Sequence, residues 1–459
     1  MQALIILSLI VFHLLDQLVG GQVVDGAFWR MCAVPIVMLL GPIVIGLQSI
    51  WSSHAAQVLP TNYQRNQQIT IGLWFVSGLL LIAVLNWGSI LRHQLQLSHF
   101  SPLDELILYA PLLISLLLCW AAQFNVERRA HGYGYGVLSR RAAIRLCWRY
   151  IAIRASVFLV PATLPLAAVL SSQAIGRWLS HASGSADSEA WVSLALLLAF
   201  FAIIPWVMAI CWRARRLPEG PLRQSILKST ADQRVSFRDI RIWPTGNQMT
   251  NAMVVGLIPK MRMLILTDRL LQLLNADELS AVVAHEAGHV RRHHLLTRMW
   301  FIVFPLFVVA TLELLLDNTS TKIPESIVGH GLNADSITWL AAPVVYAAYA
   351  LIVVGWISRK MEFQADLFAC QAIDSAGARV PSATVTRNFC DSLIKLTADS
   401  GEDATRAGWL HPSIADRVGF LQRALRCPAV AESFEKSFSR QKLLLTLAII
   451  FFATIFEML

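Results

Sequence analysis

The sequence predicts a mainly α-helical integral membrane protein, in which a multi-span bundle carries one polar domain. Of its 459 residues, 56% are hydrophobic and only 15% are charged, whereas about a quarter of the residues of a soluble protein are charged. The apolar residues come in runs of about 20, which is long enough to cross a bilayer. Among the polar stretches lies a short histidine and glutamate pattern that is typical of metal sites.

Nine apolar runs predict nine membrane spans. They lie near 3–19, 31–50, 71–91, 105–124, 151–171, 191–212, 299–316, 338–357 and 443–458. The first run has no basic segment before it and no small-residue cleavage site, so we expect a retained helix and not a signal peptide. Prolines interrupt the fifth and sixth runs, which membrane helices tolerate when neighbours satisfy the freed backbone groups.

The net charge of +9 indicates membrane anchoring and not nucleic-acid binding, because the basic residues lie mostly beside apolar runs. They are concentrated after the fourth, sixth and eighth runs: Arg128, Arg129, Arg140, Arg141, Arg145, Arg149, Arg213, Arg215, Arg216, Arg359 and Lys360. By the positive-inside rule, the amino terminus and both polar stretches face the cytoplasm. In a bacterium this places the protein in the inner membrane.

The order of apolar and polar stretches predicts the domain organisation. Residues 1–212 form a membrane region of about six spans, and residues 213–298 the first half of the polar domain. A two-span hairpin at 299–357 separates this half from the second, at 358–442, and a final span occupies 443–459. Each half is short, but together they reach a normal domain size. We therefore expect one domain assembled from both, with a small β element at its edge.

The pattern His285-Glu286-Ala287-Gly288-His289 predicts a metal site. Residues four apart share one face of a helix, so both imidazoles can reach the same ion. Glu286 lies one step round the helix, where a carboxylate can accept a proton from water. The seven cysteines form no C-x-x-C pair, so they predict neither a disulfide framework nor a cysteine metal site.

Two histidines leave a catalytic zinc ion in need of a third protein ligand. A third histidine six residues after His289 is excluded, because Leu295 stands there. His293 is on the same helical stripe but one turn too far along, which favours a polar surface role. Glu362 offers a carboxylate from another helix, and Asp366, four residues on, can hold a ligating histidine by a hydrogen bond. The alternative for Glu362 is a surface pair with Arg359.

Four motifs carry a resemblance to a known family. They are Asn251-Ala252-Met253-Val254-Val255-Gly256, the histidine pattern with its preceding Asp277-Glu278-Leu279-Ser280, the run from Ser358 to Asp366, and His411-Pro412-Ser413 with Arg417. In this order and spacing, residues 213–424 resemble the membrane zinc metallopeptidases that include the CAAX prenyl endopeptidases and the HtpX heat-shock protease. The chain departs from the pattern at Met253, where an aromatic residue is usual, and at His294, where many members have an acidic residue.

The resemblance implies a gluzincin-type zinc peptidase and assigns roles to matching residues. Zinc ligands would be His285, His289 and Glu362, with Glu286 as general base and Asp366 as hydrogen-bonding partner of a ligand. His411 and Arg417 would stabilise the oxyanion or hold the site together. Asn251, Ala252 and Met253 would lie on an edge strand that pairs with an extended peptide.

The sequence therefore predicts a membrane zinc endopeptidase with one Zn²⁺ per chain. Its expected substrates are polypeptides, either misfolded or membrane-associated, and whether prenylated peptides are included stays open. A receptor that uses the zinc site to cleave itself or one partner is a second hypothesis, although Ser225-x-x-Lys228 lacks the Lys-Thr-Gly that penicillin sensors need. A transporter or scaffold is a third, but Asp16, Arg154 and Glu313 lie near span ends, unlike a proton relay.

Overall fold

The computed structural model describes most of the chain and divides it into two compact units. The described residues are 2–19, 24–52, 60–96, 103–130, 139–160, 188–247, 249–302, 348–373, 379–401 and 403–458, with short pieces between 163 and 176. One unit comprises Met1–Ile204 and the other Pro205–Leu459. Both polar stretches of the sequence, 213–298 and 358–442, lie in the second unit.

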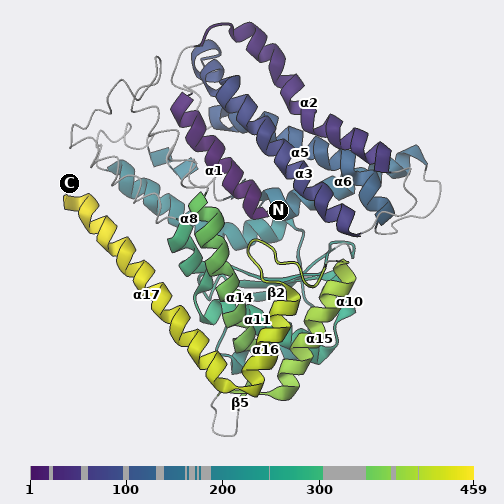
Figure 1. The fold of residues 1–459 in the computed structure, drawn as a ribbon, viewed down its shortest axis with the longest axis vertical. Helices are drawn as coiled ribbons and strands as arrows, with labels where there is room; N and C mark the ends of the chain where they lie inside the picture. Colours follow the sequence, from purple (N-terminus) through teal and green to yellow (C-terminus); the bar gives the residue numbers. More distant parts are fainter. Residues whose placement is uncertain are drawn as a thin grey trace. The chain divides into compact units, whose positions relative to one another are not determined.

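The first unit is helical (Figure 1). Its long helices are α1 (Gln2–Val19), α2 (Ala27–Ser52), α3 (Pro60–Leu79), α5 (Leu103–Ala130), α6 (Arg140–Arg154) and α8 (Ser188–Cys211), the last of which runs on into the second unit. Short helical pieces continue some of them: the π-helices η1 (Leu80–Val84), η2 (Ile90–Gln94) and η4 (Ala155–Leu159), and α4 (Trp87–Ser89). Helices are expected for such apolar sequences, because a helix forms the hydrogen bonds of its backbone N–H and C=O groups within itself.

The third apolar run, predicted as one span, is bent by 52° between Val84 and Trp87. Asn86 takes a left-handed conformation there, with φ of 51°, which asparagine tolerates better than most residues. Its side-chain Nδ2 donates a hydrogen bond of 2.9 Å to the carbonyl oxygen of Val19. The tertiary contact with α1 therefore fixes a bend that hydrophobicity alone does not reveal.

Three described helices are long and apolar enough to cross a membrane, and the bent pair brings the number to four. They match the predicted spans at 31–50, 105–124, 191–212 and 71–91. The predicted spans at 3–19 and 443–458 lie on helices α1 and α17 (Pro428–Met458). Those at 151–171, 299–316 and 338–357 lie wholly or partly outside the described residues, so the total of nine stays a prediction.

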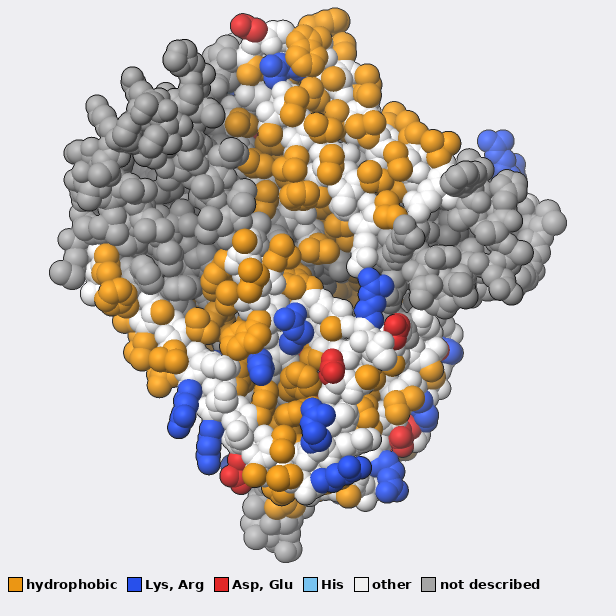
Figure 2. Space-filling model, viewed as in Figure 1, with side chains coloured by type: hydrophobic (Ala, Val, Ile, Leu, Met, Phe, Trp, Pro, Cys, Tyr) orange, Lys and Arg blue, Asp and Glu red, His pale blue; other side chains and the backbone are white. Residues whose placement is uncertain are grey.

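Helix α2 exposes the kind of surface that a lipid bilayer covers. In its apolar stretch Ala27–Gln48 only 17% of the residues are buried. The exposed side chains include Phe28, Ile36, Ile43 and Leu47. Figure 2 shows hydrophobic side chains covering this helix with few charges among them. A continuous apolar surface of this length is unfavourable in water, which supports a membrane location for α2.

The second unit is built on a four-stranded sheet in the order β1-β2-β4-β3. The strands are β1 (Arg215–Arg216), β2 (Asp239–Trp243), β3 (Ala252–Val255) and β4 (Met263–Thr267). β2 pairs with β4 in parallel, and β3 pairs with β4 antiparallel, with Ala252 opposite Leu266. All five residues of β4 are buried, as expected for a central strand, whereas β3 is an outer strand of the sheet.

Helices α9 (Pro221–Asp232), α10 (Asp268–Leu273) and α11 (Ala276–Arg291) pack on this sheet. Leu264 and Leu266 of β4 join Leu279 and Val283 of α11 in one apolar core. α11 begins with a capping box, in which Asn275 Oδ1 accepts from the Glu278 backbone and Glu278 accepts from the Asn275 backbone. Local hydrogen bonds thus fix the residue at which the histidine helix begins.

The other face of α11 packs against helices from the second polar stretch. These are α14 (Gly355–Ala369), which follows the π-helix η5 (Ala350–Val354), and α15 (Ala383–Ser400); α16 (Ile414–Arg426) packs on both of them. A short hairpin of β5 (Gln371–Ile373) and β6 (Arg379–Pro381) joins α14 to α15. Their shared core includes Ala281, Ala284, Phe389 and Leu421. Figure 1 shows α11, α14, α15 and α16 gathered beside the sheet.

The capping box generates a prediction about stability. Glu278 also accepts a hydrogen bond of 2.6 Å from Lys395 of α15. Burial opposes its ionisation, yet Lys395 and the Asn275 backbone hold the pKa of Glu278 below its ordinary value. The carboxylate therefore stabilises the fold above the unfolded pKa of about 4.3, and this stabilisation is lost as the pH falls through the folded pKa.

We expect Glu278→Gln to reduce the free energy of unfolding by about 1 kcal/mol at pH 7. The melting temperatures of variant and wild type in detergent should converge as the pH is lowered below about 4. Asp277→Asn, at an exposed neighbour in the same first turn, is the control. A difference that stayed constant with pH would contradict the role of the Glu278 charge.

Candidate metal centre

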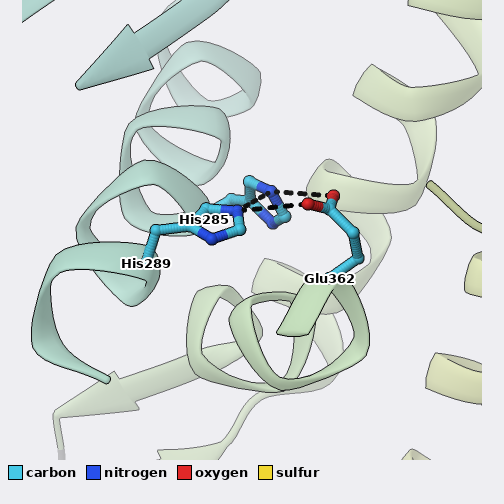
Figure 3. Close-up of side chains that lie close together, drawn as sticks. All are labelled: His285, His289 and Glu362. Carbon is cyan, nitrogen blue, oxygen red and sulfur yellow. Dashed lines mark hydrogen bonds and ion pairs between the residues drawn. The ribbon is translucent and has the colours of Figure 1, made fainter. Parts of the chain in front are cut away.

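Three side chains from two helices converge in the second unit. His285 and His289 of α11 and Glu362 of α14 each offer one ligand atom, and these atoms all lie within 4.8 Å of one another. His285 Nε2 is 3.6 Å from Glu362 Oε2, and His289 Nε2 is 3.5 Å from Glu362 Oε1. The two Nε2 atoms are 3.1 Å apart. Figure 3 shows both rings and the carboxylate turned toward one point, so the cluster can hold a metal ion.

The close approach of α11 and α14 depends on Gly288, inside the histidine pattern. A Cβ atom at Gly288 would lie 3.1 Å from Ala365 Cα and 3.2 Å from Ala365 O. These distances are shorter than ordinary contacts of a Cβ atom, so no larger residue fits without a shift of the backbone. The two small residues therefore allow Glu362, one turn before Ala365, to reach the histidines.

Asp366 and Arg417 form a buried pair behind His285. Asp366 Oδ1 is 2.9 Å from His285 Nδ1, and the Arg417 fork donates to both Asp366 oxygens at 2.6 and 2.8 Å. Asp366 is fully buried, and although burial opposes its ionisation, Arg417 keeps its pKa below the ordinary value. The structure thus turns the Arg417 guanidinium toward Asp366, which supports a role in holding the site together.

The pKa values of the two histidines in the cluster are shifted in opposite directions. Burial opposes protonation of His285, but hydrogen bonds with Asp366 and Glu362 raise its pKa to about 9. Burial lowers the pKa of His289 well below its ordinary value, so that imidazole is neutral. A metal ligand must be unprotonated, so binding of an ion would displace a proton from His285 but not from His289.

Glu286 lies beside the cluster in a partly buried position. Burial raises its pKa to about 7, and the neighbouring Glu362 carboxylate acts in the same direction against the opposing charges of His285, His411 and Arg417. A carboxyl group with a pKa near 7 can both accept and donate a proton near neutral pH. This is the behaviour expected of a general base that later acts as an acid.

His411 approaches the cluster from the loop before α16. Its Nδ1 is 3.1 Å from Glu362 Oε2, and its side chain is 63% exposed. The preceding Trp409 anchors this loop, because its indole donates to Leu351 O at 2.7 Å and its carbonyl accepts from Arg359 at 2.8 Å. Arg359 is therefore engaged with the loop and not with Glu362.

Asn251, Ala252 and Met253 lie at the start of the outer strand β3. Two hydrogen bonds join Asn251 to Thr267 at the end of β4. The backbone N–H of Asn251 donates to Thr267 Oγ1 at 2.9 Å, and its carbonyl oxygen accepts from Thr267 N at 3.0 Å. Ala252 and Met253 pair with Leu266 and Ile265. β3 packs on α11, the helix that carries both histidines, and among the described strands its other edge is unpaired.

Sequence reasoning missed one residue of the site. His294, named above only as a departure from the family pattern, is buried, and its Nδ1 lies 2.9 Å from Nδ1 of His289. Its Nε2 lies 3.0 Å from Gln364 Oε1 of α14. The helix does not continue, because α11 ends at Arg291 and His293 has a positive φ of 54°. Two adjacent histidines after the pattern were the available signal, but helical periodicity favours His293 over His294 as the neighbour of His289.

The part of the chain that carries the cluster is similar to known peptidases. Residues 222–425 match the model of "Peptidase family M48". Protease HtpX of Pseudomonas savastanoi pv. phaseolicola is 29% identical over 211 residues, which cover 44% of this chain and 70% of the relative. Protease HtpX of Thioalkalivibrio sulfidiphilus is 25% identical over 284 residues, covering 57% and 94%.

The crystal structure of S. mikatae Ste24p also matches, with a TM-score of 0.38, 17% identity, and coverage of 87% of this chain and 99% of that one. The region that matches the family model contains all three residues of the metal cluster and Glu286, and it lies in a chain with helices apolar enough to span a membrane. These matches indicate a membrane metallopeptidase whose residues 222–425 are similar to peptidase family M48.

Proposed function

We propose that the chain is an integral membrane endopeptidase that binds one zinc ion at His285, His289 and Glu362. A histidine pair with one glutamate is the ligand set of many catalytic zinc sites. For ligand bonds of about 2.0–2.1 Å in tetrahedral geometry, ligand atoms should be about 3.3 Å apart. The two Nε2 atoms here are 3.1 Å apart, each has a different Glu362 oxygen at 3.5 or 3.6 Å, and one ligand atom from each residue lies within 4.8 Å of the others, so the cluster has the size of a zinc site. This fit is the observation that carries the proposal.

When bound, zinc would supply a Lewis acid that polarises the carbonyl of the scissile peptide and makes water more acidic. The protein supplies the proton transfers. Glu286 accepts the proton of the attacking water and then donates it to the leaving amine nitrogen, and its pKa of about 7 suits both steps. Asp366 and Arg417 keep His285 oriented throughout.

The carbonyl oxygen gains negative charge as water attacks, and a nearby donor lowers the barrier. We propose His411 as this donor, which its contact with Glu362 through Nδ1 and its largely exposed side chain support. β3 would bind the substrate by strand addition along the edge with which no described strand pairs, at Asn251, Ala252 and Met253. Backbone pairing reads little sequence, so we propose polypeptides, misfolded or membrane-associated, as the substrates.

We further propose that the peptidase unit faces the cytoplasm, in the inner membrane if the organism is a bacterium. The basic residues that follow the apolar runs support this orientation. The domain division also remains a proposal: a membrane region over 1–212, polar halves at 213–298 and 358–442, and spans at 299–357 and 443–459.

The base is tested by Glu286→Gln in detergent, with an unfolded casein reporter. We expect turnover to fall by about a hundredfold to ten-thousandfold, because the amide cannot accept a proton, while one zinc per chain is retained. Glu432→Gln, at an exposed glutamate of α17, should behave as wild type. Full turnover by Glu286→Gln would exclude Glu286 as the base.

The third ligand is tested by Glu362→Ala. Loss of a direct ligand should weaken zinc binding by more than the roughly tenfold to hundredfold that outer hydrogen-bond partners contribute. The measurement is competition with a chromophoric chelator, followed by metal analysis of the purified protein. Undiminished zinc affinity would show that another residue completes the site.

Orientation can be tested with a maleimide that does not cross membranes. Cys427 is exposed, whereas Cys119, Cys370 and Cys390 are buried. A variant with Cys32→Ala, Cys147→Ala and Cys211→Ala therefore leaves Cys427 as the reactive thiol. We expect labelling of spheroplasts only after permeabilisation, and none in the same variant with Cys427→Ser. Labelling of intact spheroplasts would reverse the orientation.

A further inference from the structure

A second buried hydrogen-bond path leads from His289 to helix α17. It runs from His289 Nδ1 to His294 Nδ1 and from His294 Nε2 to Gln364 Oε1, at 2.9 and 3.0 Å. Gln364 Nε2 donates to Glu435 Oε2 of α17, and Arg292 donates to Glu435 Oε1 at 2.9 Å. His294 and Gln364 are only 2% and 1% exposed. Polar side chains buried so deeply need defined partners, and here each has them.

The break in the helix after Arg291 makes this path available. In a continuous α-helix, the fifth residue after His289 would lie about 140° round the axis from it. The left-handed turn at His293 instead starts a new helical segment at His294 and brings the two rings into contact. His293 itself is exposed, so of the two adjacent histidines only His294 is turned inward.

The donors and acceptors along the path agree in direction. His289 has Nε2 on the side of Glu362, so as a metal ligand it carries its proton on Nδ1 and donates to His294 Nδ1. His294 then has its proton on Nε2 and donates to Gln364 Oε1, and the Gln364 amide donates to Glu435. In this arrangement His294 carries a single proton, on Nε2, and accepts a hydrogen bond at Nδ1.

Aromatic packing fixes the far end of the path. Phe434, next to Glu435, lies edge-on to Phe363 of α14 and to Phe420 of α16, with ring centroids 6.2 and 5.2 Å away. Phe438, one turn on, is 1% exposed. α17 is therefore held against α14 with Glu435 directed at Gln364, and the same helix carries the predicted span 443–458.

The two histidine ligands thus have different supports. The carboxylate of Asp366 contacts Nδ1 of His285 directly. Nδ1 of His289 is instead linked to the carboxylate of Glu435 through His294 and Gln364. We propose that His294 and Gln364 are positioning residues that fix the ring of His289, and that they make the metal affinity depend on Glu435 and hence on the placement of α17. The proposal rests on the zinc site proposed above.

The test measures zinc affinity in detergent by chelator competition, together with the visible spectrum of the cobalt-substituted protein. His294→Phe keeps a ring but removes both nitrogens, and we expect about tenfold to hundredfold weaker binding and an altered cobalt spectrum. His294→Asn keeps an acceptor near His289 Nδ1, so its affinity should lie between those of His294→Phe and wild type. Glu435→Gln should also weaken binding, because the end of the path loses its charge.

Two exposed neighbours serve as controls. His293→Asn suits the left-handed turn, and Glu432→Gln lies one turn before Glu435 on α17; both should bind zinc as wild type does. Thermal unfolding of the metal-free variants shows whether each is folded, and if His294→Phe is not, His294→Asn and Glu435→Gln decide. Wild-type affinity in folded His294→Phe would overturn the positioning role, and wild-type affinity in Glu435→Gln would overturn the link to α17. A wild-type protein without zinc affinity would instead refute the proposed function.

Discussion

The contact between α11 and α14 at Gly288 and Ala365 is the constraint on which the site depends. Backbone atoms of Ala365 in α14 lie only 3.1 and 3.2 Å from the position that a Cβ atom at Gly288 would take. This contact brings Glu362 to within 3.6 Å of both histidines, although the ligands come from different polar stretches of the sequence. An added methyl group at Gly288 would have to separate the helices, and the ligand distances would change with them.

Burial then determines how the converged groups behave. The cluster places two imidazoles and a carboxylate where water is largely excluded, so each ionised group needs a partner of opposite charge or a hydrogen bond. Arg417 meets this need for Asp366, and Asp366 meets it for His285. His289 has a neutral neighbour instead, His294, and the charge that ends its path lies on α17. The metal site is therefore supported from two directions, one inside the peptidase core and one through a helix that continues into a predicted membrane span.

Local sequence signals predicted the parts of this structure that depend on nearest neighbours. The spacing of His285 and His289 puts both on one face of α11, and apolar runs predicted the helices that include α2, α5 and α8. A zinc pair without a third ligand pointed to Glu362, and the structure places that carboxylate beside the pair. The bend at Asn86 and the turn at His293 were not predicted, since each depends on a left-handed residue whose conformation is stabilised by contacts elsewhere in the fold.

By itself, the sequence determined the membrane character, the histidine pair with its adjacent glutamate, and the order of the motifs, because these follow from composition and helical periodicity. Only the tertiary structure decided how closely Glu362 approaches the histidines, that the Arg417 fork is bound to Asp366, and that His294 and not His293 contacts His289. The physical reason is that these pairings depend on how closely helices approach and how the backbone turns between them. The spacing of residues along one helix predicts neither the distance between two helices nor the direction of the turn that follows a helix.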